Sequence, residues 1–251
     1  MKKIHENLSS NLLWYSNWHN HSYANLLHWT IFILIGILTT NSLVYSASTL
    51  GRPTFIIPTN ITLPAPLELS YGTDLNQKLD LYKDNTLPAQ PVALIIHGGS
   101  WQGGDKRTVS SSLEYQAKLL YQKGFALISM NYRLAPQYPF PAAVEDVKTV
   151  VGLIEANGAS FGLLKDQIII VGESAGANLG ALVAVTDNRV KKFISVGLPS
   201  KLDDFTDDSF TGTAAGVYFG SSCKISTCLS TAKQASPYYQ ATRTLPMLLI
   251  N

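Results

Sequence analysis

Short apolar runs alternate with amphipathic stretches along residues 67–250. Continuous apolar runs are typical of strands buried on both faces of a sheet, and the run 91–97 is the clearest case. The first two strands flank a turn at 72–77, which predicts an antiparallel pair at one edge of the sheet. Strands are expected at 67–71, 78–82, 91–97, 125–130, 168–171, 192–196 and 246–250.

Helical periodicity separates the later strands. One helix is expected after residue 112, with an apolar face made of Leu113, Ala117, Leu120 and Tyr121. A second is expected to open with Pro141 at its first position and to end at Gly158 and Gly162. Its expected buried face holds Val144, Val147, Val151 and Ile154. Helices that alternate with buried strands predict an α/β fold with a doubly wound, mostly parallel sheet.

A different pattern precedes this domain. Residues 26–45 contain no Asp, Glu, Lys or Arg, and 20 apolar residues can cross a bilayer as a helix. We favour an uncleaved transmembrane signal anchor; a signal peptide cleaved near 46–48 is the alternative. Lys2 and Lys3 favour an N-terminus inside the cell, which would put the rest of the chain outside the cytoplasm.

The chain therefore divides into four parts. The polar and aromatic segment comes first, then the membrane helix, a proline-rich linker and the α/β domain. Their expected bounds are 1–25, 26–45, 46–66 and 67–251.

Composition narrows the possible partners. A net charge of +2 with scattered Lys and Arg gives no reason to expect a nucleic-acid partner. Cys223 and Cys228 match no zinc or redox motif, and we expect neither a metal nor a cofactor. In an oxidising compartment these two cysteines are expected to form a disulfide, with two free thiols as the alternative. The oligomeric state is left open.

A Gly-Glu-Ser-Ala-Gly turn joins the apolar strand 168–171 to a helix of small residues. This context predicts a nucleophile elbow that lifts Ser174 above the sheet. Gly172 and Gly176, which flank Glu173 and Ser174, have no Cβ and allow strand and helix to approach. The Ala175 N–H group begins the helix and is expected to face developing negative charge. A glycine-rich turn with an incidental serine is the alternative.

The strand 91–97 ends in His97, Gly98 and Gly99. Glycines at the carboxyl end of a strand free backbone N–H groups to point into a site. An ordinary turn before a helix is the alternative.

In these motifs the chain resembles the α/β-hydrolase superfamily, in the esterase/lipase branch near hormone-sensitive lipase and the small acetyl-esterase and feruloyl-esterase-like enzymes. The resemblance covers residues 67–251 and rests on 97–99, 131–136 with 141–143 and Asp146, and 172–176. It implies that Ser174 attacks an acyl ester. It also implies that the N–H groups of Gly98, Gly99 and Ala175 form the oxyanion hole. His97 would belong to the oxyanion loop and not be the base.

The family's acid and histidine follow the strand that corresponds to 246–250, and this chain stops at Asn251. We therefore expect a C-terminally incomplete hydrolase fold that lacks the last strand and helix. Triad acid and base are expected to be absent, and turnover to be weak or missing. The acidic stretch 200–211 is expected to be a solvated loop. A non-catalytic membrane-anchored relic or ligand-binding domain is the alternative function.

The predicted anchor can be tested by fractionation. We expect the protein to sediment with membranes and to resist extraction by high salt and by carbonate, because a spanning helix is held by its apolar surface. A soluble product that begins near Thr49 would show a cleaved signal peptide instead.

Overall fold

The computed structural model describes residues 61–221 and 223–250. The polar segment, the predicted membrane helix and most of the linker lie outside the described residues. Within the described ranges, no helix is long and apolar enough to cross a membrane.

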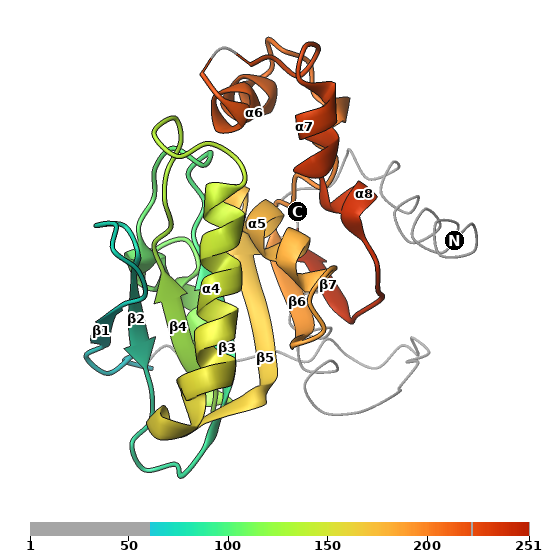
Figure 1. The fold of residues 1–251 in the computed structure, drawn as a ribbon. Helices are drawn as coiled ribbons and strands as arrows, with labels where there is room; N and C mark the ends of the chain where they lie inside the picture. Colours follow the sequence, from blue (N-terminus) through green and yellow to red (C-terminus); the bar gives the residue numbers. More distant parts are fainter. Residues whose placement is uncertain (1–60, 222, 251) are drawn as a thin grey trace, which may run out of the picture. The chain divides into compact units, whose positions relative to one another are not determined.

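A twisted sheet forms the centre of the described domain (Figure 1). The strand order is β1-β2-β4-β3-β5-β6-β7. β2 is antiparallel to both of its neighbours, whereas the pairs from β4 to β7 are parallel. This confirms the mostly parallel α/β sheet and its antiparallel leading pair. The strands are β1 Leu67–Ser70, β2 Lys78–Tyr82, β3 Gln90–Ile96, β4 Ala126–Met130, β5 Leu163–Glu173, β6 Val190–Val196 and β7 Met247–Ile250.

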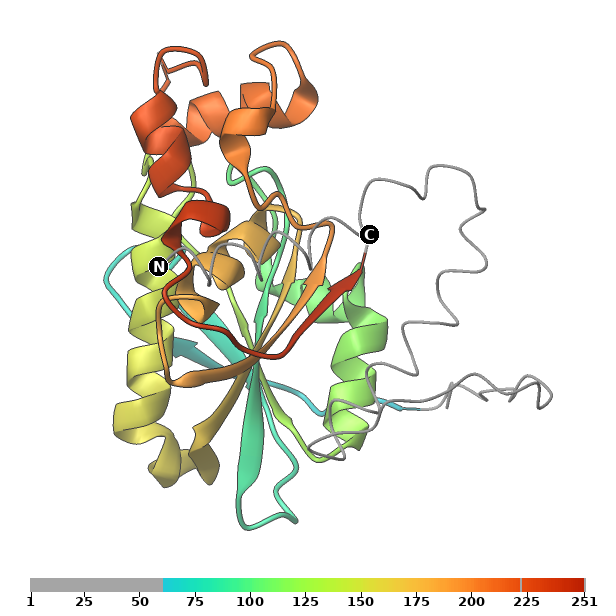
Figure 2. The same ribbon diagram turned by 90° about the vertical axis from the view of Figure 1, so that its right-hand side faces the viewer.

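Helices cover both faces of this sheet. Figure 2 shows α4 and α5 on one face and α3 on the other. The α-helices are α3 Glu114–Gln122, α4 Ala142–Asn157, α5 Ala175–Ala184, α6 Phe210–Phe219, α7 Leu229–Gln234 and α8 Pro237–Gln240. Three short 3₁₀ helices are η3 Lys106–Ser110, η4 Gly158–Phe161 and η5 Leu202–Asp204.

The predicted apolar face of α4 is buried against the sheet, including Val147 and Val151 with no exposed surface. The helix begins one residue later than predicted. Pro141 is the N-cap residue, and its carbonyl accepts hydrogen bonds from the N–H groups of Val144 and Glu145. Gly158 is the C-cap and starts η4, and Gly162 then ends η4 with a φ of 70°.

β5 is longer than the apolar run that predicted it. Its first residue, Leu163, pairs with Gln90 of β3, and the polar residues 165–167 that follow are exposed. These polar residues lie outside the apolar alternation, so hydropathy alone predicted only the buried part of the strand.

A buried carboxylate ties the loop 131–141 to the start of α4. The side chain of Asp146 has no exposed surface and accepts hydrogen bonds from the Arg133 N–H at 2.8 Å and from Gln77 Nε2 at 2.8 Å. The Arg133 guanidinium forms an ion pair with it at 2.9 Å. A buried charge is tolerated only with such partners, so this contact fixes both segments.

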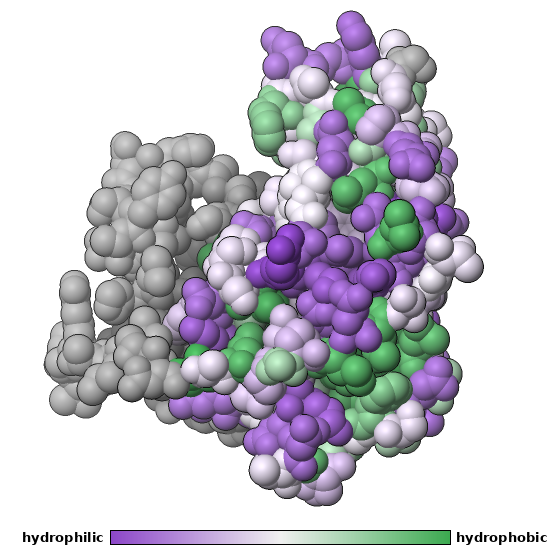
Figure 3. Space-filling view, turned by 90° about the vertical axis from the view of Figure 1, so that its left-hand side faces the viewer, coloured by the Kyte–Doolittle hydropathy of each residue, from purple (hydrophilic) through white to green (hydrophobic). Residues whose placement is uncertain are grey.

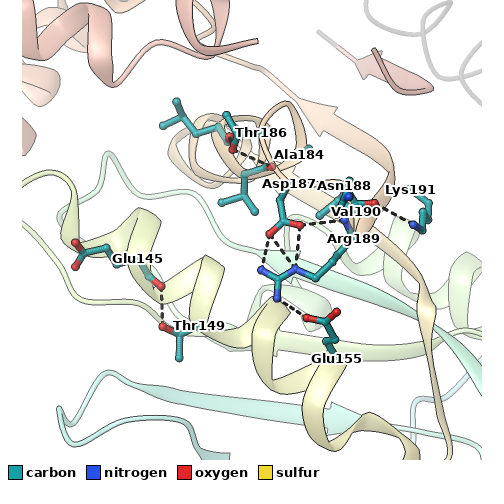
Figure 4. Close-up of polar contacts among 12 residues, drawn as sticks. Glu145, Thr149, Glu155, Ala184, Thr186, Asp187, Asn188, Arg189, Val190 and Lys191 are labelled. Atoms are coloured by element: carbon teal, nitrogen blue, oxygen red, sulfur yellow. Dashed lines mark hydrogen bonds and ion pairs between the residues drawn. The ribbon is translucent and has the colours of Figure 1, made fainter. Parts of the chain in front are cut away.

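A second ion-pair network joins α4 to the turn between α5 and β6 (Figure 4). Arg189 contacts Asp187 at 2.6 Å and Glu155 of α4 at 2.8 Å. Arg243 lies just before β7, and its Nη1 donates to the carbonyls of Ala184, Asp187 and Val190. The chain that enters β7 is thereby fixed against the end of α5.

Residues 197–246 link β6 to β7 and carry η5 and α6 to α8; we call them the cap segment. Figure 1 shows its helices above α5, which follows the carboxyl end of β5. Cys223 and Cys228 form a disulfide in the turn between α6 and α7. The helices of this segment were not predicted from the sequence.

An apolar groove of about 210 Å³ lies between the β1–β2 edge and α4. Figure 3, viewed from the β1 side, shows apolar surface gathered among polar residues on this side of the molecule. Leu69, Leu81 and Phe161 are among its lining residues. None of the predicted site residues lines this groove.

The Asp146 network gives a stability prediction. Asp146→Ala should lower the free energy of unfolding by about 3 kcal/mol, because it leaves Arg133 and Gln77 without their acceptor. Urea denaturation measures the change. Glu145→Ala is the matched control, since Glu145 is 60% exposed and lies 3.5 Å from the same guanidinium. Its effect should stay within about 0.5 kcal/mol, and equal losses for the two variants would contradict the assignment.

Candidate active site

Ser174 lies at the turn between β5 and α5, and it is exposed. Its φ of 50° and ψ of −116° are rare for a residue with a side chain and cost about 1–3 kcal/mol. The turn is fixed on both sides, because the Ser174 N–H donates to Val196 O of β6 at 2.8 Å and the Ser174 carbonyl accepts from Asn178 N at 3.1 Å.

The two elbow glycines are required by close contacts. A Cβ on Gly172 would lie 2.5 Å from the Gly176 carbonyl oxygen, and a Cβ on Gly176 would lie 2.3 Å from the carbonyl oxygens of both Ile96 and His97. Real Cβ atoms do not approach oxygen this closely. The start of α5 therefore packs directly against the end of β3.

The loop after β3 reaches Ser174. A Cβ on Gly98 would lie 3.3 Å from the Ser174 Cβ, so the two backbones are adjacent. Gly99 has a φ of 117°, and its carbonyl accepts from the N–H groups of Gln102 and Gly103, both at 3.0 Å. Ala175 opens α5, where the first N–H groups have no partner within the helix. The structure thus brings Gly98, Ser174 and Ala175 together.

The His97 side chain supports the loop that follows β3. Its ring is buried, stacks on Tyr132 with 4.3 Å between ring centroids, and directs Nδ1 at the Gly98 carbonyl oxygen at 2.7 Å. Because a carbonyl can only accept, Nδ1 carries the proton. Burial lowers the pKa of His97, so the ring is neutral near pH 7. Gly104, with a φ of 100°, leaves room for Nδ1, which a Cβ there would approach to 2.2 Å.

Glu173 links the elbow to the segment before α3. Its Oε2 accepts a hydrogen bond from Ser112 Oγ at 2.5 Å, and Ser112 Oγ also lies 2.9 Å from Thr108 Oγ1. Ser112 and Thr108 belong to no motif, so the sequence alone does not identify them.

Two aromatic residues near the site were also missed. Trp101 lies two residues after Gly99, has a φ of 59° and is 2% exposed. It stacks on Tyr218 of α6, with 4.7 Å between ring centroids and 4° between ring planes. The position of the tryptophan beside the motif could have identified it from the sequence, whereas nothing in the sequence points to its partner 117 positions away.

The acidic stretch 200–211 belongs to the cap segment, and its aspartates have protein partners. Asp203 accepts from the Tyr239 hydroxyl at 2.7 Å, and Asp204 pairs with Lys201. Asp207 accepts hydrogen bonds from the backbone and side chain of Ser226. Among the described residues, no group of three His, Cys, Asp or Glu side chains could hold a metal ion.

A strained serine at a strand–helix turn, on a mostly parallel sheet of this strand order and beside a glycine loop, is the arrangement of an α/β-hydrolase. The BD-FAE family model matches residues 79–222, which is more than half of the chain. The chain belongs to the BD-FAE family.

Curated relatives are esterases that match over part of their length. Esterase LipC of Mycobacterium tuberculosis is 34% identical over 122 residues, which cover 47% of this chain and 29% of LipC. Carboxylesterase NlhH of the same species is 30% identical over 131 residues, which cover 49% of this chain and 39% of NlhH. The chain thus spans well under half the length of these relatives.

Solved structures share the fold. A truncated carbohydrate esterase from gut microbiota has a TM-score of 0.62 at 20% identity, with 76% of this chain and 78% of that chain covered. Inhibited esterase B from Lactobacillus rhamnosis has a TM-score of 0.57 at 21% identity, with 76% and 68% covered. At this identity the likeness shows the fold alone.

The elbow contacts predict the effect of a single methyl group. Gly176→Ala should destabilise the domain by on the order of 3 kcal/mol, because its Cβ collides with two backbone oxygens. Thermal unfolding measures the change. Gly152→Ala in α4 is the control: its Cβ would meet nothing closer than 3.6 Å, and alanine should raise stability by up to about 1 kcal/mol. A tolerated Gly176→Ala would refute this packing.

Proposed function

We propose that this protein is a carboxylic ester hydrolase in which Ser174 is the nucleophile. The observation that carries the proposal is the strained, exposed Ser174 beside the backbone of Gly98. Strain of this kind persists where the surrounding structure holds it, and it is common at active sites. Membership of the BD-FAE family and the esterase relatives support the same reaction class.

The proposed reaction is acyl transfer through the serine. Ser174 Oγ attacks the ester carbonyl carbon and loses its proton to a base, and the carbonyl oxygen becomes an oxyanion. The N–H groups of Gly98, Gly99 and Ala175 stabilise that charge. The carbon–oxygen bond to the alcohol then breaks, the alcohol leaves with a proton, and water releases the acid from Ser174 by the same route in reverse.

In this proposal the rate of ester hydrolysis is limited by the lack of an identified general base for Ser174. His97 is the one histidine among the described residues; it is buried, and its Nδ1 is bound to the Gly98 carbonyl. We assign it to support of the oxyanion loop. We assign no other described residue as the acceptor of the Ser174 proton, and we therefore expect these 251 residues to turn over esters weakly.

The test is hydrolysis of p-nitrophenyl acetate. The 251-residue chain should show little turnover. A version joined in frame to the acid- and histidine-bearing segment of a related hydrolase should be faster by on the order of 10³-fold or more, because triad members act together. Ser174→Ala should abolish the gain. Fast, Ser174-dependent hydrolysis by the 251 residues alone would show that they contain a base not identified above.

A ligand-binding domain without turnover is the second candidate, and it is favoured by the lack of a second histidine among residues 61–221 and 223–250. If the joined version folds but gains no Ser174-dependent hydrolysis, the ester-hydrolase proposal fails. Equal affinity of the chain and its Ser174→Ala variant for a short ester, measured by calorimetry, would then support a binding role.

We also propose that the domain is tethered to a membrane and lies outside the cytoplasm. The charge-free stretch 26–45 and the basic residues before it support this location. The Cys223–Cys228 disulfide agrees with an oxidising compartment.

A further inference from the structure

The oxyanion loop has a single ring stack with the cap segment in the described part of the chain. Trp101, two residues after Gly99, lies flat against Tyr218 of α6. Both rings are buried. Since α6 lies in the cap segment, the loop beside Ser174 is in contact with a part of the chain more than 100 residues away.

The backbone around this stack is fixed by two further contacts. The Trp101 carbonyl accepts a hydrogen bond from Ala135 N at 2.9 Å, and the Tyr218 carbonyl accepts one from Phe140 N at 2.7 Å. The Phe140 ring also meets the Tyr218 ring edge-on, with 5.7 Å between centroids. Two points of the loop 131–141, Ala135 and Phe140, are therefore hydrogen-bonded to the two stacked residues.

α6 is itself held at both ends by the disulfide turn. Before the helix, Asp207 accepts two hydrogen bonds from Ser226. After it, Cys223 N donates to the Gly220 carbonyl at 2.7 Å. Gly216 in the last turn leaves no room for a side chain, because a Cβ there would lie 2.5 Å from the Cys223 carbonyl oxygen. Tyr218 is thus presented from a fixed support.

The loop that Tyr218 contacts needs outside support. Ser100 and Trp101 both have a positive φ, 55° and 59°, and both carry side chains. Two successive residues in this region persist only where neighbouring groups hold them. Ala135 N fixes the Trp101 carbonyl, and the ring stack fixes its side chain.

We propose that Tyr218 is a positioning residue for the oxyanion hole. Through Trp101 it holds the strained loop, and thereby aims the N–H groups of Gly98 and Gly99 at the carbonyl oxygen of a bound ester. This inference rests on the proposed ester hydrolysis. Under this proposal the cap segment contributes to catalysis by holding the oxyanion loop, because hydrogen-bond donors of an oxyanion hole act only when they are held in place.

The tyrosine hydroxyl has no part in this role. Tyr218 Oη and Trp101 Nε1 have no hydrogen-bond partner among the described residues. The flat face of the ring is what contacts Trp101, so phenylalanine should replace tyrosine without loss, whereas an aliphatic side chain should not.

The first test needs no turnover. Hydrogen exchange followed by mass spectrometry on the full 251-residue chain should show at least about tenfold faster exchange over residues 97–104 in Tyr218→Leu. Tyr218→Phe should match the wild type. Phe219→Leu is the matched control: Phe219 is the next residue of α6, is 8% exposed, and its ring partner is Tyr218. It should leave exchange at 97–104 unchanged.

The second test follows Ser174-dependent hydrolysis by the version joined to the acid- and histidine-bearing segment of a related hydrolase, into which each substitution is introduced. Tyr218→Leu should lower kcat about tenfold or more with KM within about twofold, and Tyr218→Phe should restore kcat, since the oxyanion hole acts mainly in the transition state. Phe219→Leu should keep the wild-type kcat. A folded joined version without Ser174-dependent turnover would contradict the proposed function, and the exchange test would still decide whether Tyr218 holds the loop 97–104.

Two outcomes overturn the positioning role. One is wild-type exchange at 97–104 in Tyr218→Leu, and the other is an equal rise in Phe219→Leu, which would show general loosening of α6. Should Tyr218→Leu fail to fold in a thermal scan, Tyr218→Met takes its place, because the unbranched side chain fills the space and lacks the aromatic face.

Discussion

The rest of the site depends on the contact between the start of α5 and the end of β3. Gly176 lies so close to the Ile96 and His97 carbonyls that no side chain fits between them. This contact brings the turn of Ser174 and the loop of Gly98 to the same point. β3 and β5 are paired in register up to Ile96 and Gly172, so the sheet itself delivers the two loops side by side. Ser174 adopts its strained φ of 50° at this point.

Periodicity and glycine spacing were enough to predict the sheet and the elbow turn. The runs 91–97 and 168–171 are apolar because β3 and β5 are buried on both faces, and burial is what hydropathy reports. The length of β5 was underestimated because residues 165–167 are polar and exposed and give no apolar signal. It also placed Pro141 one position too far into α4, where helix ends are set by local backbone geometry.

The cap segment was beyond such reasoning. α6 has buried residues around most of its circumference, including Ala214, Ala215, Tyr218 and Phe219. It therefore shows no apolar stripe from which a helix could be predicted. The stack of Trp101 on Tyr218 and the bond from Ser112 to Glu173 join residues far apart in sequence. Such pairs follow from the tertiary arrangement, whereas the oxyanion motif and the elbow are local.

The path of the chain between β6 and β7 has a consequence for how such proteins vary. These two strands are parallel neighbours, so the chain between them must run back to the end of the sheet where β6 began. Arg243 fixes the last part of this connection to the end of α5. The entropic free-energy cost of closing a loop grows slowly, by about 0.6 kcal/mol for each doubling of the loop length. Insertions into the cap segment therefore cost the sheet little, provided that both anchored ends remain. A family built this way can vary its cap segment while it keeps one elbow turn.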